Sequence, residues 1–363
     1  MIFNDKQLNF IERLQNELDG ETAFVIESSI NRFYFTGLMS SAGYLFVTKE
    51  KSYCLVDFRY FEAAKKVIKD CEVICYYNYR DEILKLINKN NIKSIIIENE
   101  KISLSKAQKW KQFTDKENIM LIDDDSLDKI ILSFRKIKTN DEINKIKSAQ
   151  KITQAAFEHI LNKLKIGVTE KQIALEIEFF MRKNGAQAMS FNPIVLFGEN
   201  TSLPHGVPSN RKLKNGDFVL MDTGCVFEGY CSDMTRTVAF NFATEEQKRV
   251  YDIVLKAQRA AINEVKSGVV CSKVDKTARD IIYNAGYEGY FGHGTGHSLG
   301  LEIHESPSFS ISDESILDEN IVMTVEPGIY LPNKFGVRIE DMLIVKDGYN
   351  EDITDCEHNL IIV

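Results

Sequence analysis

The sequence lacks any hydrophobic run that approaches the roughly 18 residues needed to cross a bilayer. Its start, MIFNDKQLNF, has no basic segment followed by an apolar one, so we expect no secretory signal peptide. Positive charge is not in excess either, because 45 Lys and Arg stand against 53 Asp and Glu. Phosphate binding requires a basic face, which this balance does not favour. We therefore expect neither a membrane nor a nucleic acid as a partner.

Cysteine is present but forms no recognisable metal or redox motif. There are seven cysteines, an odd number, and Cys71 and Cys75 lack the C-x-x-C spacing. This pattern favours a reduced, cytoplasmic compartment and buried, unreactive thiols. Cys225 and Cys231 are the exceptions of interest, because they flank the carboxylates Asp222 and Asp233.

At 363 residues, with 44% hydrophobic residues, the chain is long enough for two domains with large cores. Residues 1–132 alternate strand-like and helix-like segments, which predicts an α/β domain. That domain has no clustered His or Cys and no Gly-rich phosphate loop, so we expect it to play a supporting role. The polar, basic segment 133–140 marks the boundary to a second domain, residues 133–363. We see no internal repeat or low-complexity tract.

The expected elements follow from hydrophobic periodicity and from Gly, Asn and Pro punctuation. In the first domain, helices are expected at 1–19, 60–68, 81–89 and 103–113, and strands at 23–26, 33–35, 44–47, 53–56, 72–75 and 95–97. The first helix has a stripe formed by Leu8, Ile11, Leu14 and Leu18. In the second domain, helices are expected at 139–165, 169–184, 244–266 and 272–284. Capping boxes open the first and third of these. The strands between them predict an α+β domain, with helices covering one face of an antiparallel sheet.

One stretch, GDFVLMDTGCVFEGYCSDMTRT at 216–237, organises the second domain. It reads as two strands joined by a short connection, with Asp222 at the end of an apolar run and Asp233 eleven positions later. A hairpin can bring the two carboxylates face to face on one surface of a sheet. Both can stay ionised at close range only if something cationic lies between them. The stretch therefore suggests a cation site.

Further polar signals follow in glycine- and proline-rich segments and at strand ends. They are His205, His293, His297, His304, Glu326, Arg338 and Glu340. The spacing of two between Arg338 and Glu340 predicts that both lie on one face of a single strand, 337–345. A set of one or two His with four carboxylates suits Mn, Fe, Co or Zn. Bridging carboxylates can hold two such ions about 3.5–4 Å apart. The glycines around His293 and His297 would let backbone pack closely there.

Each residue also has an ordinary structural interpretation. Asp222 could belong to an Asp-Thr-Gly turn, Asp233 could pair with Arg236, and Glu340 could pair with Arg338. A lone His in a Gly-rich loop is more often structural than a ligand. The joint order of two Asp, a His-Gly-Thr-Gly-His loop and two Glu favours a metal centre over these separate explanations. We assign no role to His159 or His358.

Four motifs carry a family resemblance: MDTGCVFEGYCSDMTRT, GHGTGHSLGLEIHE, TVEPGIY and GVRIEDMLIV. They resemble the aminopeptidase P, prolidase and methionine aminopeptidase superfamily, whose catalytic domain has the pita-bread fold. They cover most of residues 190–345. The resemblance implies five metal ligands, Asp222, Asp233, His297, Glu326 and Glu340, with Asp233 and Glu340 bridging two ions. In the first half, INRFYFTG and LVDFRYFEAA are similar to the N-terminal domain of the Xaa-Pro peptidases.

The resemblance implies hydrolysis of the bond between an N-terminal residue and proline in short proline-containing peptides, and a homodimer. It also implies two divalent ions, with Mn²⁺ first and Co²⁺, Zn²⁺ or Fe²⁺ as options. Glu326 is the candidate general base or proton shuttle. His205 and His304 would stabilise the oxyanion or donate to the substrate carbonyl. His293 would line the proline pocket, and Arg338 would orient a ligand carboxylate or the product carboxylate.

Several alternatives stay open at this point. A dipeptidase and an aminopeptidase differ in how the far end of the substrate is accommodated, which the residues do not reveal. Methionine aminopeptidase and the metal-free creatinase share the fold, and some relatives are non-catalytic peptide-binding proteins. From the residues alone, a two-metal phosphoesterase is a further possibility, but no basic phosphate clamp accompanies the ligands.

Overall fold

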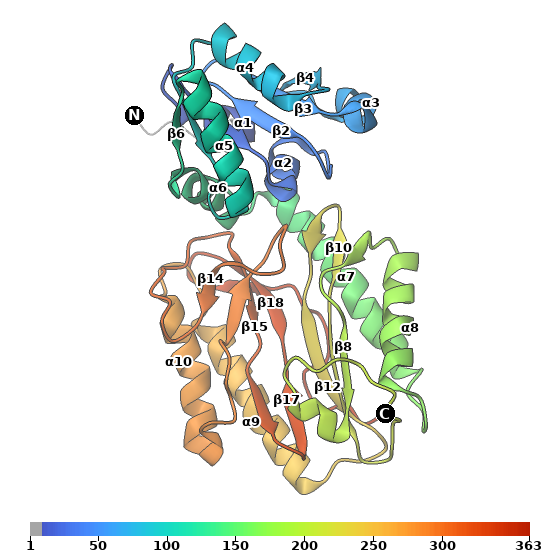
Figure 1. Cartoon of the computed structure of the whole chain (residues 1–363). Coiled ribbons are helices and arrows are strands. Elements are labelled where there is room, and N and C mark those ends of the chain that lie inside the picture. Colours follow the sequence, from blue (N-terminus) through green and yellow to red (C-terminus); the bar gives the residue numbers. More distant parts are fainter. Residues whose placement is uncertain (1–8) are drawn as a thin grey trace. The chain divides into compact units, whose positions relative to one another are not determined.

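The computed structural model describes residues 9–363, and the chain divides into two compact units, 1–135 and 136–363 (Figure 1). The helix expected at the start is α1 (Phe10–Asn16), which opens with a capping box between Asn9 and Glu12. Ile11 and Leu14 of the expected stripe are buried in it, whereas Leu8 lies outside the described residues.

The first unit is a six-stranded mixed sheet with helices. Its elements are β1 (Thr22–Ile26), α2 (Ser29–Thr36), β2 (Tyr44–Val47), β3 (Ser52–Val56), α3 (Phe58–Val67), β4 (Glu72–Cys75), α4 (Tyr79–Lys89), β5 (Ser94–Ile97), α5 (Leu104–Glu117), β6 (Met120–Ile122) and α6 (Ser126–Lys136). The strand order is β4-β3-β2-β1-β5-β6, with β1–β2 and β2–β3 antiparallel and the other pairs parallel. Parallel pairs require crossover helices, which explains the α/β pattern of the sequence.

The strand predicted at 33–35 is wrong, because these residues lie in helix α2. The Ser28 side chain caps its N-terminus by accepting from Asn31 N, and Gly37 ends it with a left-handed φ of 71°. The aromatic residues that suggested a strand, Tyr34 and Phe35, instead form part of a buried helical face. Two good caps therefore outweigh the modest strand preference of the aromatics between them.

The second unit contains four long helices and several short antiparallel sheets. Its elements are α7 (Asn140–Leu161), α8 (Glu170–Lys183), β7 (Ala188–Met189), β8 (Ile194–Phe197), a 3-10 helix (Gly198–Ser202), β9 (Phe218–Thr223), β10 (Cys225–Phe227), β11 (Tyr230–Cys231), β12 (Met234–Ala239), α9 (Glu245–Glu264), α10 (Cys271–Ile282), a short π-helix (Tyr283–Tyr287), β13 (Gly296–Ser298), β14 (Glu305–Phe309), β15 (Val322–Val325), β16 (Gly328–Leu331), β17 (Phe335–Arg338), β18 (Asp341–Val345) and β19 (Asn350–Asp352). The predicted capping boxes at Thr139 and Thr244 are both present.

Strand β9 is central to this unit, because it lies between β8 and β12 in an antiparallel sheet. Val219 and Met221 point into a core that also contains residues of α7 and α8. Phe218 belongs to the other core, which contains residues of α9 and α10. Figure 1 shows the two helix pairs flanking the strands on opposite sides. Successive side chains of a strand alternate in direction, so Asp222 points away from the side that Met221 faces.

The single strand predicted at 337–345 is interrupted at Ile339 and Glu340. Strand β17 pairs with β16, whereas β18 pairs with β15 and β19, so the chain changes sheets at this point. The backbone N–H of Glu340 donates instead to the carbonyl oxygen of Thr235, at 3.1 Å. The expected single sheet is accordingly divided into several, and the division places Glu340 at a junction between them.

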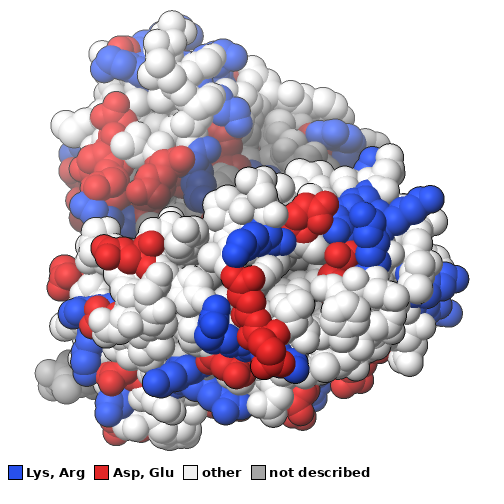
Figure 2. Space-filling model, turned by 90° about the horizontal axis from the view of Figure 1, so that it is seen from below, with Lys and Arg blue, Asp and Glu red and all other residues white. Residues whose placement is uncertain are grey.

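No helix among residues 9–363 is both long enough and apolar enough to span a bilayer. On the face drawn in Figure 2, acidic and basic side chains lie near one another over much of the surface, and several basic side chains gather towards its right edge.

Candidate metal centre

A pocket of about 650 Å³ lies in the second unit and gathers the polar residues that the sequence singled out. Its lining includes Asp222, Asp233, His297, Glu326, Glu340, Arg338, His205, His293 and His304. These residues come from β9, the start of β12, β13, the end of β15, the β17–β18 junction and three loops. All the site residues predicted from the sequence therefore line one cavity, although they are spread over more than one hundred positions of the chain.

The two aspartates reach the pocket through the β9–β12 ladder. Asp222 lies directly opposite Thr235 on the neighbouring strand, and Asp233 lies two positions before Thr235. Residues two apart on one strand face the same way, so both carboxylates point to the same side of the sheet. The expected hairpin thus forms, with the β10–β11 excursion as its connection.

His297 and the two glutamates complete the cluster. His297 Nε2 lies 3.4 Å from Glu326 Oε1 and 3.7 Å from Asp233 Oδ2. One ligand atom from each of Asp233, His297 and Glu340 lies within 4.8 Å of the others. The glycine next to His297 is required sterically, because a Cβ on Gly296 would lie 2.0 Å from the carbonyl oxygen of Thr324. Close packing of backbone beside the histidine, predicted from the glycines, is confirmed there.

The hydrogen bonding of these carboxylates is incomplete. Among the described residues, three buried carboxylate oxygens have no hydrogen-bond partner: Asp222 Oδ1, Asp233 Oδ1 and Glu340 Oε1. Buried polar atoms are normally satisfied, and an ionised carboxylate without a partner is especially unfavourable. Three orphaned oxygens that line one pocket, beside a His nitrogen, form a donor set that fits divalent cations.

The pKa directions agree with this interpretation. Burial, followed by repulsion from neighbouring carboxylates, raises the pKa of Asp233 and of Glu340 well above the usual range. Burial also raises the pKa of Glu326 and lowers that of His297. Without a cation, the carboxyl groups are therefore pushed towards their protonated forms and the imidazole towards its neutral form. A bound divalent cation reverses this preference for the carboxylates, because it offsets both burial and mutual repulsion.

Arg338 is linked by hydrogen bonds to two of the carboxylates in the cluster. Its Nη2 donates to Asp222 Oδ2 at 2.5 Å, and its Nε donates to Thr235 Oγ1 at 3.0 Å. The hydroxyl of Thr235 in turn donates to Glu340 Oε2 at 2.7 Å. Burial alone would lower the pKa of Arg338, but its contact with Tyr330 and the negative charge of Asp222 outweigh burial and raise that pKa well above its ordinary value. One guanidinium thus orients one proposed ligand directly and another through a hydroxyl group.

Tyr330 belongs to the site and was missed from the sequence, although it ends the quoted motif TVEPGIY. Arg338 Nη1 donates to its hydroxyl at 2.8 Å, and that hydroxyl lies 2.9 Å from His293 Nε2. His293 Nδ1 lies 2.8 Å from the carbonyl oxygen of Gly294, which can only accept. The proton therefore resides on Nδ1, and the Tyr330 hydroxyl donates to Nε2. Burial lowers the pKa of His293, which favours this neutral tautomer.

His205 and His304 are exposed residues of the pocket lining. The rings of His304 and His297 are 4.5 Å apart between centroids, at 71°. His205 lies in the turn Leu203–Gly206, whose ends meet through a hydrogen bond from Gly206 N to Leu203 O. Both side chains thus border the cavity that holds the carboxylates, but neither belongs to the cluster of Asp233, His297 and Glu340.

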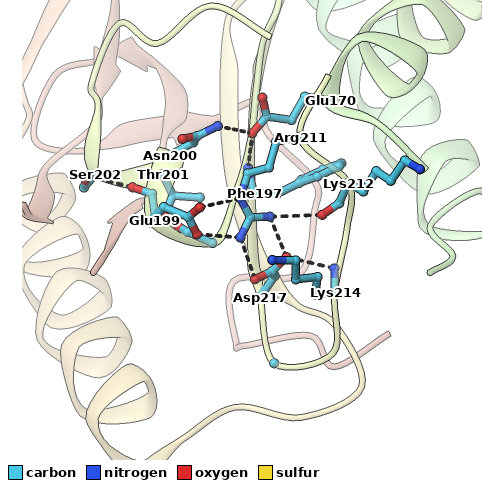
Figure 3. A network of polar contacts seen from close by, with 12 residues as sticks. Glu170, Phe197, Glu199, Asn200, Thr201, Ser202, Arg211, Lys212, Lys214 and Asp217 are labelled. Carbon is cyan, nitrogen blue, oxygen red and sulfur yellow. Dashed lines mark hydrogen bonds and ion pairs between the residues drawn. The ribbon is translucent and has the colours of Figure 1, made fainter. Parts of the chain in front are cut away.

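A buried network anchors the segment that carries His205 (Figure 3). The carboxylate of Glu170 accepts from Phe197 N and Asn200 Nδ2 on one side and from Ser209 N and Oγ on the other. Arg211 also pairs with Glu199 and Asp217, as the same figure shows. Both ends of the loop around His205 are therefore fixed to the rigid part of the unit.

Other candidates from the sequence lie outside the site. All seven cysteines are free thiols. Cys225 and Cys231 are buried, and burial raises the pKa of Cys231 to about 12, so these two are unreactive at neutral pH. His159 pairs with Glu176 and His358 with Asp341, away from the pocket lining. Among the described residues that line the pocket, only Arg338 carries a permanent positive charge, and it already forms an ion pair with Asp222.

Comparisons with known proteins show the family to which the chain belongs. The model of metallopeptidase family M24 matches residues 144–347, and that of the creatinase/prolidase N-terminal domain matches residues 11–137. The Xaa-Pro dipeptidase of Pyrococcus furiosus is 34% identical over 358 residues, covering 98% of this chain and 99% of that protein.

Two solved structures are similar over nearly the full length. The Xaa-Pro dipeptidase from Bacillus anthracis has a TM-score of 0.92 and 38% identity, covering 97% of this chain and 99% of that one. The X-Pro aminopeptidase from Thermotoga maritima MSB8 has a TM-score of 0.89 and 36% identity, covering 96% and 100%. The predicted fold, an α/β N-terminal domain followed by a pita-bread catalytic domain, is confirmed.

Proposed function

Because the chain belongs to metallopeptidase family M24 and carries a creatinase/prolidase N-terminal domain, we propose that it hydrolyses the Xaa-Pro bond at the N-terminus of dipeptides or short peptides. Members of this family bind divalent metals. The observation that carries the proposal is the set of orphaned carboxylate oxygens beside His297 in a pocket of peptide size. The relatives named Xaa-Pro dipeptidase and X-Pro aminopeptidase support the proline specificity.

Asp222, Asp233, His297, Glu326 and Glu340 would hold two divalent cations, with Mn²⁺ proposed first and Co²⁺, Zn²⁺ or Fe²⁺ as options. When bound, these ions would supply a water ionised near neutral pH and polarise the scissile carbonyl. An Xaa-Pro bond has no N–H to donate, so a site that acts on the carbonyl suits this substrate.

The protein's own groups would perform the remaining tasks. Glu326 is partly buried beside His297, and it would accept a proton from the attacking water and return it to the leaving nitrogen of proline. His205 and His304 border the pocket and would donate to the substrate carbonyl as negative charge develops on its oxygen. His293 accepts from Tyr330 and would present its ring to the proline side of the substrate. Arg338 holds Asp222 and Tyr330, so it would keep the ligand set in place.

The test is a paired hydrolysis assay on protein that has been stripped of metal and reloaded with Mn²⁺. One substrate is Ala-Pro and the other is Ala-Pro-Ala-Ala, with Glu340→Ala as the inactive control. Cleavage of the dipeptide alone indicates a dipeptidase, and cleavage of the longer peptide indicates an aminopeptidase. Met-Ala peptides and creatine are included because methionine aminopeptidase and creatinase share the fold. The Xaa-Pro proposal fails if neither proline substrate is cleaved by the metal-loaded protein.

A further inference from the structure

Lys138 is a buried cation in the segment between the two domains, immediately before the capping box of α7. Its side chain is 1% exposed, and its Nζ lies 3.2 Å from Glu305 Oε2, 3.2 Å from Ser298 Oγ and 3.3 Å from the carbonyl oxygen of Lys136. The side chain of Glu305 is 4% exposed. A buried ion pair of this kind adds little net stability compared with apolar residues, so its presence calls for another explanation.

The two side chains that Lys138 contacts on the β13–β14 hairpin are directly paired. Ser298 on β13 lies opposite Glu305 on β14, with a register shift between His297 and Ser298. His297 immediately precedes Ser298, and His304 immediately precedes Glu305. The ammonium group therefore joins the two strands at the pair that immediately follows both histidines, whose rings are in edge-to-face contact.

The turn between the strands is also tied to Glu305. Its Oε1 accepts from Glu302 N at 3.2 Å, and a Cβ on Gly300 would lie 2.8 Å from its Oε2. From outside the hairpin, Cys231 N donates to the carbonyl oxygen of Gly300 at 2.7 Å. The Glu305 carboxylate thus contacts the turn that leads into His304 and also binds the ammonium group of Lys138.

We propose that Lys138 is a positioning residue of this site: its ammonium holds Ser298 and Glu305 together and so sets the position of His304 relative to His297. This inference rests on the proposed function, in which His304 donates to the substrate carbonyl. Lys138 does not line the pocket, so it acts through the hairpin and not on the substrate.

A double-mutant cycle separates positioning from general stabilisation. Lys138→Met, His304→Ala and the double variant are compared as full-length, Mn²⁺-loaded protein with an Xaa-Pro substrate. In the wild-type background we expect Lys138→Met to lower kcat about 10- to 100-fold, the range for residues that orient a functional group. In the His304→Ala background we expect a further loss within about twofold, because the group being positioned is already absent. Equal losses in the two backgrounds would overturn the proposal.

The matched control is Lys147→Met. Lys147 lies on α7 and pairs with Glu351 at 2.5 Å, and neither residue lines the pocket. We expect its kcat to equal that of the wild type. If Lys138→Met does not fold, Glu305→Gln removes the charge of the partner and keeps its shape, and Lys138→Arg retains the cation. The proposal then requires Glu305→Gln to reproduce the coupling to His304 and Lys138→Arg to retain more activity than Glu305→Gln.

A second readout does not depend on activity. In metal-free protein with labelled histidine, the ring signal of His304, assigned with His304→Ala, should shift in Glu305→Gln and Lys138→Met but not in Lys147→Met. An unchanged His304 signal would overturn the positioning role even if the enzyme cleaves Xaa-Pro peptides. Conversely, a shifted signal in a protein that cleaves no proline peptide would support the positioning of His304 and refute the proposed function alone.

Discussion

Buried carboxylates occur in both units of the chain, but their surroundings differ. Glu98 in the first unit is 2% exposed and accepts from Glu27 N, Ser28 N and Asn31 Nδ2 at 2.6–2.7 Å. Glu340 in the second unit is 1% exposed, accepts one hydrogen bond from Thr235 and leaves Oε1 without a partner. Burial raises the pKa of both carboxyl groups. Only the second arrangement leaves an oxygen free for a cation.

Glu170 extends the comparison within the second unit. It is fully buried, yet both of its oxygens accept from backbone and side-chain donors. Figure 3 shows the donors to one of these oxygens, Phe197 and Asn200. Burial of an acidic residue therefore does not by itself mark a functional site. The distinguishing feature is an oxygen that the protein leaves unsatisfied, in a pocket with several others.

The largest expected effect comes from substituting the two carboxylates compared above, Glu340 and Glu98. Glu340→Ala removes a proposed bridging ligand, so we expect Xaa-Pro hydrolysis to fall by more than about 100-fold, beyond the range for residues that only support ligands. Glu98→Gln keeps the shape of a structural carboxylate and should leave kcat unchanged. Initial rates and thermal melting of both variants provide the test. Equal activity of the two would remove the basis for the contrast.

Arg338→Met comes next. It leaves Asp222 without its cationic partner and Tyr330 without a donor, so we expect kcat to fall about 10- to 100-fold, as for other groups that orient metal ligands. Metal affinity, measured by titration calorimetry, should weaken in parallel. Loss of activity with unchanged affinity would instead mean that Arg338 acts on the substrate.

The pH dependence of the metal-free protein sharpens the comparison further. Asp233 and Glu340 have raised folded-state pKa values, so the folded protein binds more protons than the unfolded chain above about pH 4. The stability that these two groups contribute is therefore fully present below that pH and falls as pH rises, by at most about 1.4 kcal/mol per pH unit for each group. Urea unfolding in chelator from about pH 5 to about pH 8 measures the slope.

Adding Mn²⁺ should abolish this fall, because the bound cation then stabilises the ionised carboxylates in the folded protein. Glu340→Gln should make the stability of the metal-free protein fall less steeply with pH, because it removes one of the two groups with a raised pKa. An unchanged slope in metal-free Glu340→Gln would contradict the raised pKa of Glu340. The variant is compared with the wild type because His293, His297 and His304, whose pKa values are lowered, make an opposite contribution to the total slope.

Tyr330→Phe is expected to have the smallest effect. It removes one hydroxyl that connects Arg338 to His293, and one hydrogen bond contributes about 1 kcal/mol, or roughly fivefold in rate. The loss should appear mainly in KM if His293 contacts the proline side of the substrate. A change confined to kcat would place the hydroxyl in the chemical step instead.

Much of this arrangement could be predicted from local patterns. Capping boxes located the starts of α7 and α9, and apolar runs that end in a carboxylate located β9 and Asp222. Such signals are local, because a cap or an alternating strand depends on residues a few positions apart. The five proposed ligands came from the family resemblance of the motifs that contain them, and the structure brings these residues into one pocket.

The remaining features depend on contacts between distant segments. The break at Glu340 arises because β17 and β18 pair with different strands, which residues 337–345 alone cannot indicate. The helix at 29–36 was missed because its aromatic residues favour strands, although Ser28 and Gly37 supplied the caps. Lys138 contacts partners about 160 positions away in sequence, so no motif contains it. Tyr330 ends the motif TVEPGIY, but its contact with His293 depends on the fold.

Metal stoichiometry tests the central claim most directly. Wild-type, Glu98→Gln and Glu340→Ala proteins are stripped, incubated with Mn²⁺, freed of excess ion and analysed for metal per chain. The unsatisfied carboxylates predict two ions per chain in the wild type and in Glu98→Gln, and one or none in Glu340→Ala. Binding of no Mn²⁺, Co²⁺, Zn²⁺ or Fe²⁺ by the wild type, or equal binding by all three proteins, would contradict the account.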